Sequence, residues 1–220
     1  MNDLKRLPYQ PLKALPRPAV GTSEQLIALP EPDRTSGLPL MGALWQRKST
    51  RTFEEQALPP TLLSELLWAA DGINRPQGGG RTAPTPHGEN VIDVYAALPS
   101  GLYRYDPVHH YLQLKLAEDV RSLTGYQDFV GMAPLDLVYV VNHGRMQEVP
   151  PKLRETFAAA AAGAMAQNVY LYCASTGLGT VIRGWLNRQQ LAEHMSLNED
   201  EGPILSQTVG YPAKDENWLL

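Results

Sequence analysis

The sequence lacks the features that mark several large classes of protein. Cys173 is the single cysteine among 220 residues, so no disulfide can close within the chain, and no Cys/His pair has the spacing of zinc ligands. The longest apolar run, residues 157–166, has ten residues, whereas a membrane-spanning helix needs about twenty. These absences exclude a disulfide framework, a zinc site and a membrane-spanning helix. We therefore expect Cys173 to be a small buried apolar residue.

Short motifs of common enzyme classes are also missing. No GxSxG elbow occurs, which argues against a serine hydrolase. Neither GxGxxG nor GxxxxGK[ST] occurs, and "GLGTVI" at 177–182 stops after its first GxG and follows a helix, contrary to the order of a dinucleotide-binding turn. The five histidines form no i, i+3 or i, i+4 pair that could hold a metal. His109 and His110 are expected in a turn, pointing into solvent, while both a site role and a plain loop role stay open for His87.

Composition indicates one soluble globular domain. Hydrophobic residues make up 43% of the chain, enough for a substantial core. The net charge of -4 gives no general attraction to a polyanion, so nucleic acid is not an expected partner. No charged start followed by an apolar run opens the chain, which favours the cytoplasm. Residues 1–39, however, are Pro-rich like the spacer that can follow a removed export signal, so an exported protein is the alternative.

Hydrophobic periodicity divides the chain into an arm and one domain. Prolines are too frequent in residues 1–39 for a long helix or a central strand, so we expect an extended arm on the surface. Residues 40–220 are predicted to form an α+β domain, in which helices flank a mixed or antiparallel sheet. The predicted helices are 40–46, 60–71, 151–176 with Gly177 just past its end, and one capped by Asn187 with Gln190 three residues on. The predicted strands are 91–97, 102–105, 111–116, 135–142, 179–182 and 204–210.

Two further features of this pattern bear on function. Residues 73–90 form a loop rich in Gly, Pro and hydroxyls, which is too long to be only a connection. In the helix 151–176, Ala159, Gly163 and Ala166 are small enough to let another backbone approach. That helix could be an ordinary core helix or the seam of a dimer, and the sequence leaves both possibilities open.

The stretch "QRKSTRTF" at 46–53 gathers hydrogen-bond donors. It places Arg47, Lys48 and Arg51 around the hydroxyls of Ser49 and Thr50. Cations just after a helix are also favoured by the helix dipole, so a solvated helix end is one explanation. A phosphate site is the other, because guanidinium groups grip phosphate oxygens with paired hydrogen bonds.

Four segments in order resemble the nitroreductase superfamily of FMN flavoproteins. They are "RKSTR" at 47–51, "TAPTPHGEN" at 82–90, "AQNVYLYCASTGLGTVIRGW" at 166–185 and "TVGYP" at 208–212, and the similarity runs from about residue 40 to residue 212. "LLWAADGINR" at 66–75 and "GLYRYDP" at 101–107 further resemble the subgroup related to dehydrogenases that oxidise azolines in peptides. The resemblance implies a nitroreductase-like homodimer with FMN at the subunit interface.

The resemblance also implies site residues. Arg47, Lys48 and Ser49 would contact the FMN phosphate and ribityl chain, and Arg51 would reach the pyrimidine edge of the flavin, where a cation stabilises the reduced ring. The segments around the ring would supply the remaining contacts: Pro84, Thr85 and Pro86 along the ring, Gly88 and Asn90 near an amide position, and backbone N–H groups of Arg183 and Gly184 near N5. No side chain is assigned a catalytic role, because the flavin N5 carries the hydride.

Two departures from the family pattern carry expectations of their own. Arg183 stands where many members have Glu, which suggests a positive charge beside the flavin and a preference for anionic substrates. Lys214 is the cation expected to take the role of the family's basic C-terminal segment, and the arm exchanged between subunits is expected to be short.

The implied activity is a ping-pong reduction. NADH or NADPH would reduce the flavin and leave, and a nitroaromatic, a quinone or a similar small acceptor would then take the electrons. One alternative is oxidation of a substrate, as in the azoline dehydrogenases, with a nearby Tyr or Lys as base and partner proteins. Another is a flavin-binding protein without turnover.

Overall fold

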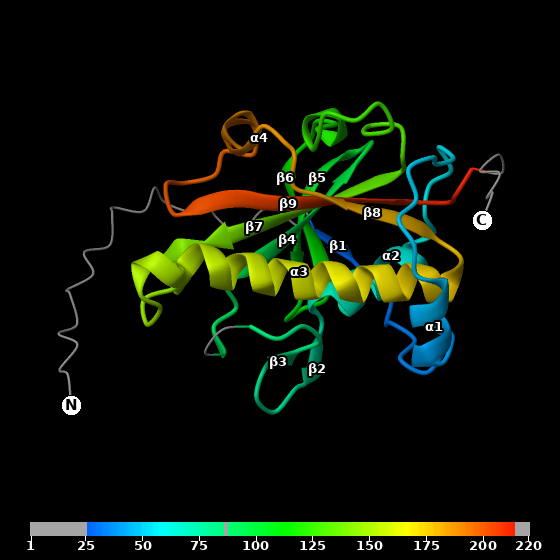
Figure 1. Cartoon of the computed structure of the whole chain (residues 1–220), viewed down its shortest axis with the longest axis horizontal. Helices are drawn as coiled ribbons and strands as arrows, with labels where there is room; N and C mark the ends of the chain where they lie inside the picture. The colour runs from blue at the N-terminus through cyan, green and yellow to red at the C-terminus, as the bar shows by residue number, and fades with distance from the viewer. Residues whose placement is uncertain (1–25, 86–87, 214–220) are drawn as a thin grey trace.

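The computed structural model describes residues 26–85 and 88–213, which form one antiparallel sheet with helices on both faces (Figure 1). The helices are α1 (Leu40–Gln46), α2 (Pro60–Asp71), α3 (Pro151–Thr176) and α4 (Arg188–His194). The strands are β1 (Leu26–Ala28), β2 (Ile73–Arg75), β3 (Gly80–Arg81), β4 (Ile92–Leu98), β5 (Gly101–Asp106), β6 (Tyr111–Leu116), β7 (Leu135–Asn142), β8 (Gly179–Arg183) and β9 (Glu201–Gly210).

The main sheet has seven strands in the order β1-β6-β5-β4-β7-β9-β8. Neighbouring strands pair antiparallel throughout, which confirms the predicted α+β class. Of the two sheets that the sequence left open, mixed and antiparallel, the protein has the antiparallel one. Strand β7 lies in the centre and all of its residues are buried, as its nearly continuous apolar sequence predicted. Strand β8 forms one edge, so one side of its backbone remains available to other segments.

Alternation along β7 separates two hydrophobic layers. Leu137 and Tyr139 belong to the larger core, which lies against α2 and α3. Val138 and Val140 belong to the smaller core on the opposite face, against α4. Figure 1 shows α3 and α4 on opposite sides of the sheet. Because side chains alternate between faces of a strand, the position of a residue in β7 decides which layer it joins.

The helix ends follow their sequence signals. Helices α2 and α3 both begin with proline in the first turn. Helix α3 ends at Gly177, which adopts a left-handed φ of 75° that favours glycine. The side chain of Asn187 caps α4 by accepting a hydrogen bond from the N–H of Gln190 at 3.1 Å, as predicted. Cys173 is buried in α3, which confirms its predicted apolar role, and burial raises the pKa of its thiol.

Helix α3 does not present its small residues to one neighbour. Ala166 is buried, and its carbonyl accepts a hydrogen bond from Gln207 at 3.2 Å, while Ala159 is exposed. The buried side of α3 is an ordinary core face. The exposed side leaves the possibility of a dimer seam open.

The predicted arm is described from residue 26 onward; residues 1–25 lie outside the described part. Strand β1 extends the sheet by pairing with β6, an addition that the proline pattern did not predict. The structure corrects the expectation for His110, whose ring is not directed into solvent. It accepts a hydrogen bond from Tyr105 at 2.9 Å and donates one to Ser64 at 2.7 Å in the tautomer that satisfies both contacts. A left-handed φ of 54° at His110 turns its side chain back toward the arm.

The predicted loop 73–90 contains a short hairpin. Strands β2 and β3 pair antiparallel there, a pairing that the Gly-rich composition did not predict. Within residues 26–85 and 88–213, no helix has the length and apolar character needed to cross a membrane.

Candidate functional site

The segment that carries the basic residues lies along the free edge of β8. The N–H of Thr50 donates to the carbonyl of Thr180 at 3.0 Å, and Phe53 forms a bridge with Pro212. A side chain at Gly179 would collide with Thr50, so glycine allows this close approach. The segment is therefore fixed against the sheet, and its donors are held in place.

Tyr170 of α3 connects this segment to β8. Its hydroxyl lies 2.8 Å from Ser49 Oγ and accepts a hydrogen bond from the N–H of Ile182 at 3.0 Å. The guanidinium of Arg47 lies over the Tyr170 ring, 5.3 Å from the ring centre. Tyr170 is buried, so its ring and hydroxyl contact Arg47 and Ser49 from the interior of the protein. Sequence reasoning missed this role, because nothing local distinguishes Tyr170 from other apolar positions of a helix.

The donors of the segment suit a phosphate group. Arg47 and Ser49 are half-buried, whereas Lys48 and Arg51 are exposed. Lys48 also lines a cavity of about 220 Å³ between α3 and the segment. The cations lie beyond the last turn of α1, which itself contains no basic residue. Two guanidinium groups, an ammonium group and a hydroxyl on one fixed strip match the needs of a phosphate, and the strip fits a phosphorylated cofactor on chemical grounds.

The segment around Gly184 meets the basic segment along β8. Gly184 follows the strand directly and is exposed. The next residue, Trp185, is 74% exposed and lies edge-on to Tyr126, with ring centres 6.0 Å apart. Because Ser49 is linked through Tyr170 to Ile182, the basic segment and the Gly184 region belong to one surface. This pair of aromatic rings is a feature that sequence reasoning did not single out.

The expectation for the side chain of Arg183 is wrong. Its guanidinium is buried and points to the face opposite α3, where it donates to Asp136 at 2.5 Å and to Thr124 at 3.0 and 3.1 Å. Burial raises the pKa of the Asp136 carboxyl, and the adjoining guanidinium and the Thr208 hydroxyl oppose that rise. The charge of Arg183 is thus neutralised inside the protein. It gives no reason to expect a preference for anionic substrates.

The loop before β4 does not join the basic segment and the segment around Gly184 within one chain. In Figure 1 it lies beside the β2–β3 hairpin, below the middle of α3, whereas the basic segment follows α1 at the right-hand end of α3. Pro84 and Gly88 are exposed, Thr85 is half-buried, and the carbonyl of Asn90 accepts a hydrogen bond from Arg145 at 2.9 Å. Within one chain, this loop therefore stays apart from the basic segment and from the segment around Gly184. Pro86, His87 and Lys214 lie outside the described residues.

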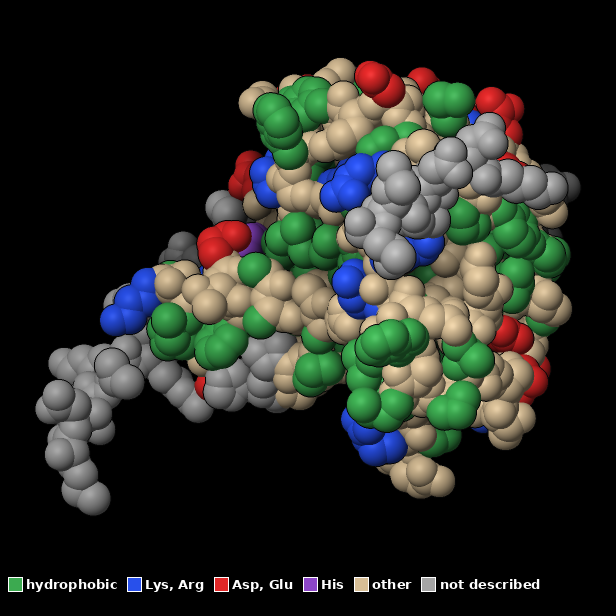
Figure 2. All heavy atoms as spheres, turned by 45° about the vertical axis from the view of Figure 1, so that its right-hand side comes forward, with side chains coloured by type: hydrophobic (Ala, Val, Ile, Leu, Met, Phe, Trp, Pro, Cys, Tyr) green, Lys and Arg blue, Asp and Glu red, His purple; other side chains and the backbone are tan. Residues whose placement is uncertain are grey.

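An apolar surface borders the basic segment. Figure 2 shows hydrophobic side chains gathered over α1, with Lys and Arg side chains beside them. Exposure is largest at Trp45 (90%), Met41 (74%) and Leu40 (63%). These large side chains lie together on seven residues of helix, and exposed apolar groups of this kind commonly mark contact surfaces.

Comparison with known proteins identifies close relatives. A sequence model described as the nitroreductase family matches residues 44–211. A protein of Methanocaldococcus jannaschii that carries the name of a nitroreductase is 31% identical over 181 residues, covering 78% of this chain and 90% of the relative. A crystal structure described as a nitroreductase from Ralstonia eutropha JMP134 is 78% identical, with a TM-score of 0.84 over 94% of this chain and 99% of that chain.

Two more distant structures share the fold. A chain of the Escherichia coli microcin synthetase McbBCD complex, bound to truncated pro-MccB17, is 19% identical, with a TM-score of 0.65 over 93% of this chain and 79% of that chain. The NADPH:FMN oxidoreductase of Vibrio harveyi, complexed with NAD+, is 19% identical, with a TM-score of 0.59 over 80% of this chain and 69% of that chain.

Proposed function

This chain belongs to the nitroreductase family and is an oxidoreductase of the flavin type, and from that premise we propose that it binds FMN and uses NADH or NADPH to reduce small acceptors. Nitroaromatics and quinones are the acceptor classes proposed. The observation that carries the proposal is the fixed strip of donors at Arg47, Ser49 and Arg51, which lies on the same surface as Gly184.

The residues of this surface divide the binding between them. Arg47, Lys48 and Ser49 are proposed to hold the phosphate and the ribityl chain, with Ser49 oriented by its hydrogen bond to Tyr170. Arg51 is exposed and is proposed to reach the pyrimidine edge of the ring. Gly184 would bring its backbone close to the ring without steric hindrance. FMN, when bound there, would supply hydride exchange with the nucleotide and the acceptor at N5.

We propose that the protein is a homodimer with the cofactor at the subunit interface. Two observations support this arrangement. The exposed apolar face of α1 borders the basic segment, and burial in a dimer would remove it from water. The loop containing Pro84, Thr85 and Gly88 is remote from the segment in one chain, so in the dimer it would approach the ring from the second copy.

Substrate oxidation of the azoline-dehydrogenase type is a second candidate function. The similarity to a microcin synthetase chain over 93% of this protein favours it. Tyr126 is exposed and its ring lies 6.0 Å from that of Trp185, the residue after Gly184, so its phenol is the base that we assign. A flavin-binding protein without turnover would keep the same donor strip and lack both activities.

Purified protein separates these functions. A yellow protein whose colour bleaches anaerobically on addition of NADH or NADPH is the expected result. Colour that neither nucleotide bleaches would replace the reductase with the dehydrogenase or the binding protein. A colourless protein that takes up no added FMN would remove all three.

A further inference from the structure

The outer edge of strand β8 presents backbone groups to the basic segment in a regular row, while strand β9 pairs with its other edge. On the outer edge, the carbonyl of Thr180 accepts a hydrogen bond from the N–H of Thr50 at 3.0 Å. Two residues on, the N–H of Ile182 donates to the hydroxyl of Tyr170 at 3.0 Å. Backbone groups of every second residue face the same edge of a strand, so the next position of this row is Gly184.

The peptide bond between Arg183 and Gly184 directs the N–H of this third position. Arg183 is the last residue of β8 and pairs with Ser206 of β9, so its carbonyl faces β9 by the same alternation. In a trans peptide the carbonyl and the following N–H point in opposite directions. The N–H of Gly184 therefore faces the outer edge, on the side of Ser49. Among residues 26–85 and 88–213, it has no backbone hydrogen-bond partner.

The carbonyl of Gly184 is held by Arg188. One terminal nitrogen of that guanidinium, Nη2, donates to the carbonyl of Gly184 at 3.0 Å and to the carbonyl of Ile204 at 3.0 Å. An NH2 group carries two hydrogens, so it can serve both carbonyls at once. Arg188 is the first residue of α4, which Asn187 caps, so its backbone is fixed. Its side chain thus connects the residue after β8 to strand β9.

Both carbonyls lie where the regular pairing of the sheet is interrupted. The pairing of β8 with β9 ends one residue before Gly184. Ile204 falls at a register shift of β9 against β7, between Pro203 and Leu205, which each pair with a residue of β7. A residue at such a shift is left out of the ladder of backbone hydrogen bonds. Arg188 therefore supplies, from a side chain, the bonds that the ladder does not supply to Gly184.

We propose that Arg188 is a positioning residue for the cofactor, because it holds Gly184 so that the N–H on the outer edge donates to N5 of FMN. The inference rests on the proposed function, in which the backbone of Gly184 lies close to the ring. Ser49 is linked through Tyr170 to Ile182, and two residues of a strand span only about 6.6 Å. A flavin anchored on the basic segment therefore has this N–H within its reach.

5-Deaza-FMN is the probe for this contact. It has the shape and charge of FMN, but a C–H group replaces N5 and cannot accept a hydrogen bond. The protein is used as purified, with its bound FMN. In a competition titration with 5-deaza-FMN, the fluorescence of released FMN gives the ratio of the two dissociation constants. The parent protein should prefer FMN by about fivefold, the discrimination expected from one hydrogen bond.

Variants of Arg188, which is exposed, test its role. Arg188→Met removes both bonds, so the preference for FMN should fall below about twofold. Arg188→Lys keeps a cation with three N–H groups and should keep a preference of at least about threefold. Arg154→Met is the matched control, since Arg154 also donates to a backbone carbonyl, that of Val149 at 3.1 Å. Each ratio compares two flavins in one variant, so a general loss of stability or charge cancels.

The inference is overturned if the parent protein binds both flavins equally, because N5 then accepts no hydrogen bond from the protein. A preference that is undiminished in Arg188→Met, or that Arg154→Met lowers as much, would also overturn it. These results leave the proposed function intact, since FMN is still bound. A parent protein that binds neither flavin would overturn the proposed function, and this inference with it.

Discussion

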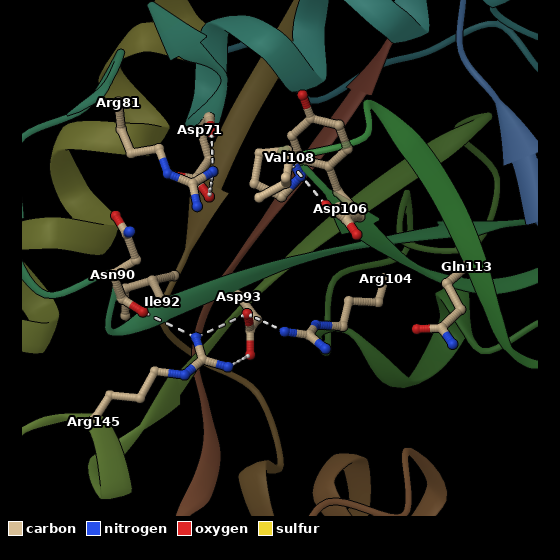
Figure 3. A pocket seen from close by; sticks show the side chains of 12 residues that line it. Asp71, Arg81, Asn90, Ile92, Asp93, Arg104, Asp106, Val108, Gln113 and Arg145 are labelled. Atoms are coloured by element: carbon tan, nitrogen blue, oxygen red, sulfur yellow. Dashed lines mark hydrogen bonds and ion pairs between the residues drawn. The ribbon is translucent and has the colours of Figure 1, made fainter. Parts of the chain in front are cut away.

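Two arginine-bearing regions of this molecule differ in how their charge is opposed. On the strip at 47–51, neither Arg47 nor Arg51 forms an ion pair with an acidic side chain of residues 26–85 or 88–213, and Arg47 instead lies over the ring of Tyr170. Around a cavity of about 270 Å³ between β4 and β5, Arg104 and Arg145 share the carboxylate of Asp93 inside the protein (Figure 3). An arginine is therefore evidence for a ligand site only where no acidic side chain of the protein already pairs with it.

Removing the shared carboxylate should produce the largest effect. Asp93→Ala leaves Arg104 and Arg145 facing each other without a counter-charge, and breaking a buried pair in this way costs about 3–5 kcal/mol. The free energy of unfolding, measured with urea, checks this. Asp119→Ala, which removes the exposed partner of Arg121, is the control and should cost less than about 1 kcal/mol. An equal loss of unfolding free energy in both variants would mean that burial of the carboxylate makes no difference to its contribution.

The pH dependence of stability should reveal the second carboxylate of the cavity. Burial, the largest influence, raises the pKa of Asp71 from 3.8 to about 7, with Arg81 and Arg145 opposing the rise and Asp93 adding to it. Between about pH 4 and pH 7, the folded protein keeps a proton that the unfolded chain has released, so this group lowers stability as pH rises.

Asp71→Asn removes that dependence. The variant should gain stability over the parent protein as pH rises from 4 to 8, by at most about 4 kcal/mol, the free-energy equivalent of the pKa difference. Urea unfolding of both proteins at each pH gives the difference directly, and the other titrating groups cancel. A difference that stays constant with pH would mean that Asp71 titrates normally.

Changes in the donor strip should affect the cofactor more than the fold. Arg47→Ala combined with Ser49→Ala should weaken FMN retention at least tenfold, because each charged hydrogen bond contributes about 1.5–3 kcal/mol. Fluorescence of released FMN on dilution measures retention. Arg154→Ala, on the far part of α3, is the control and should retain FMN normally. Unchanged retention in the double variant would mean that the strip is only a solvated helix end.

Local patterns predicted the elements well where one physical rule governed them. The continuous apolar run at 135–142 gave the central strand β7, and Asn187 with Gly177 marked helix ends that the structure confirms. The same rules missed β1 and the β2–β3 hairpin, because such short segments become strands only where a neighbouring strand pairs with them. The candidate site was only partly predictable: the donors at 47–51 could be found, whereas their support by Tyr170 could not.

The sequence by itself determined the four helices and the longer strands, where the helices end and which stretch offers donors for a phosphate, since these follow from spacing along the chain. Only the tertiary structure decided where charge is neutralised. Arg183 is paired with Asp136 across 47 positions, and Asp93 is shared with Arg145 across 52. A charge in the interior takes its partner from whatever segment packs beside it, and that neighbour is set by the order of strands in the sheet.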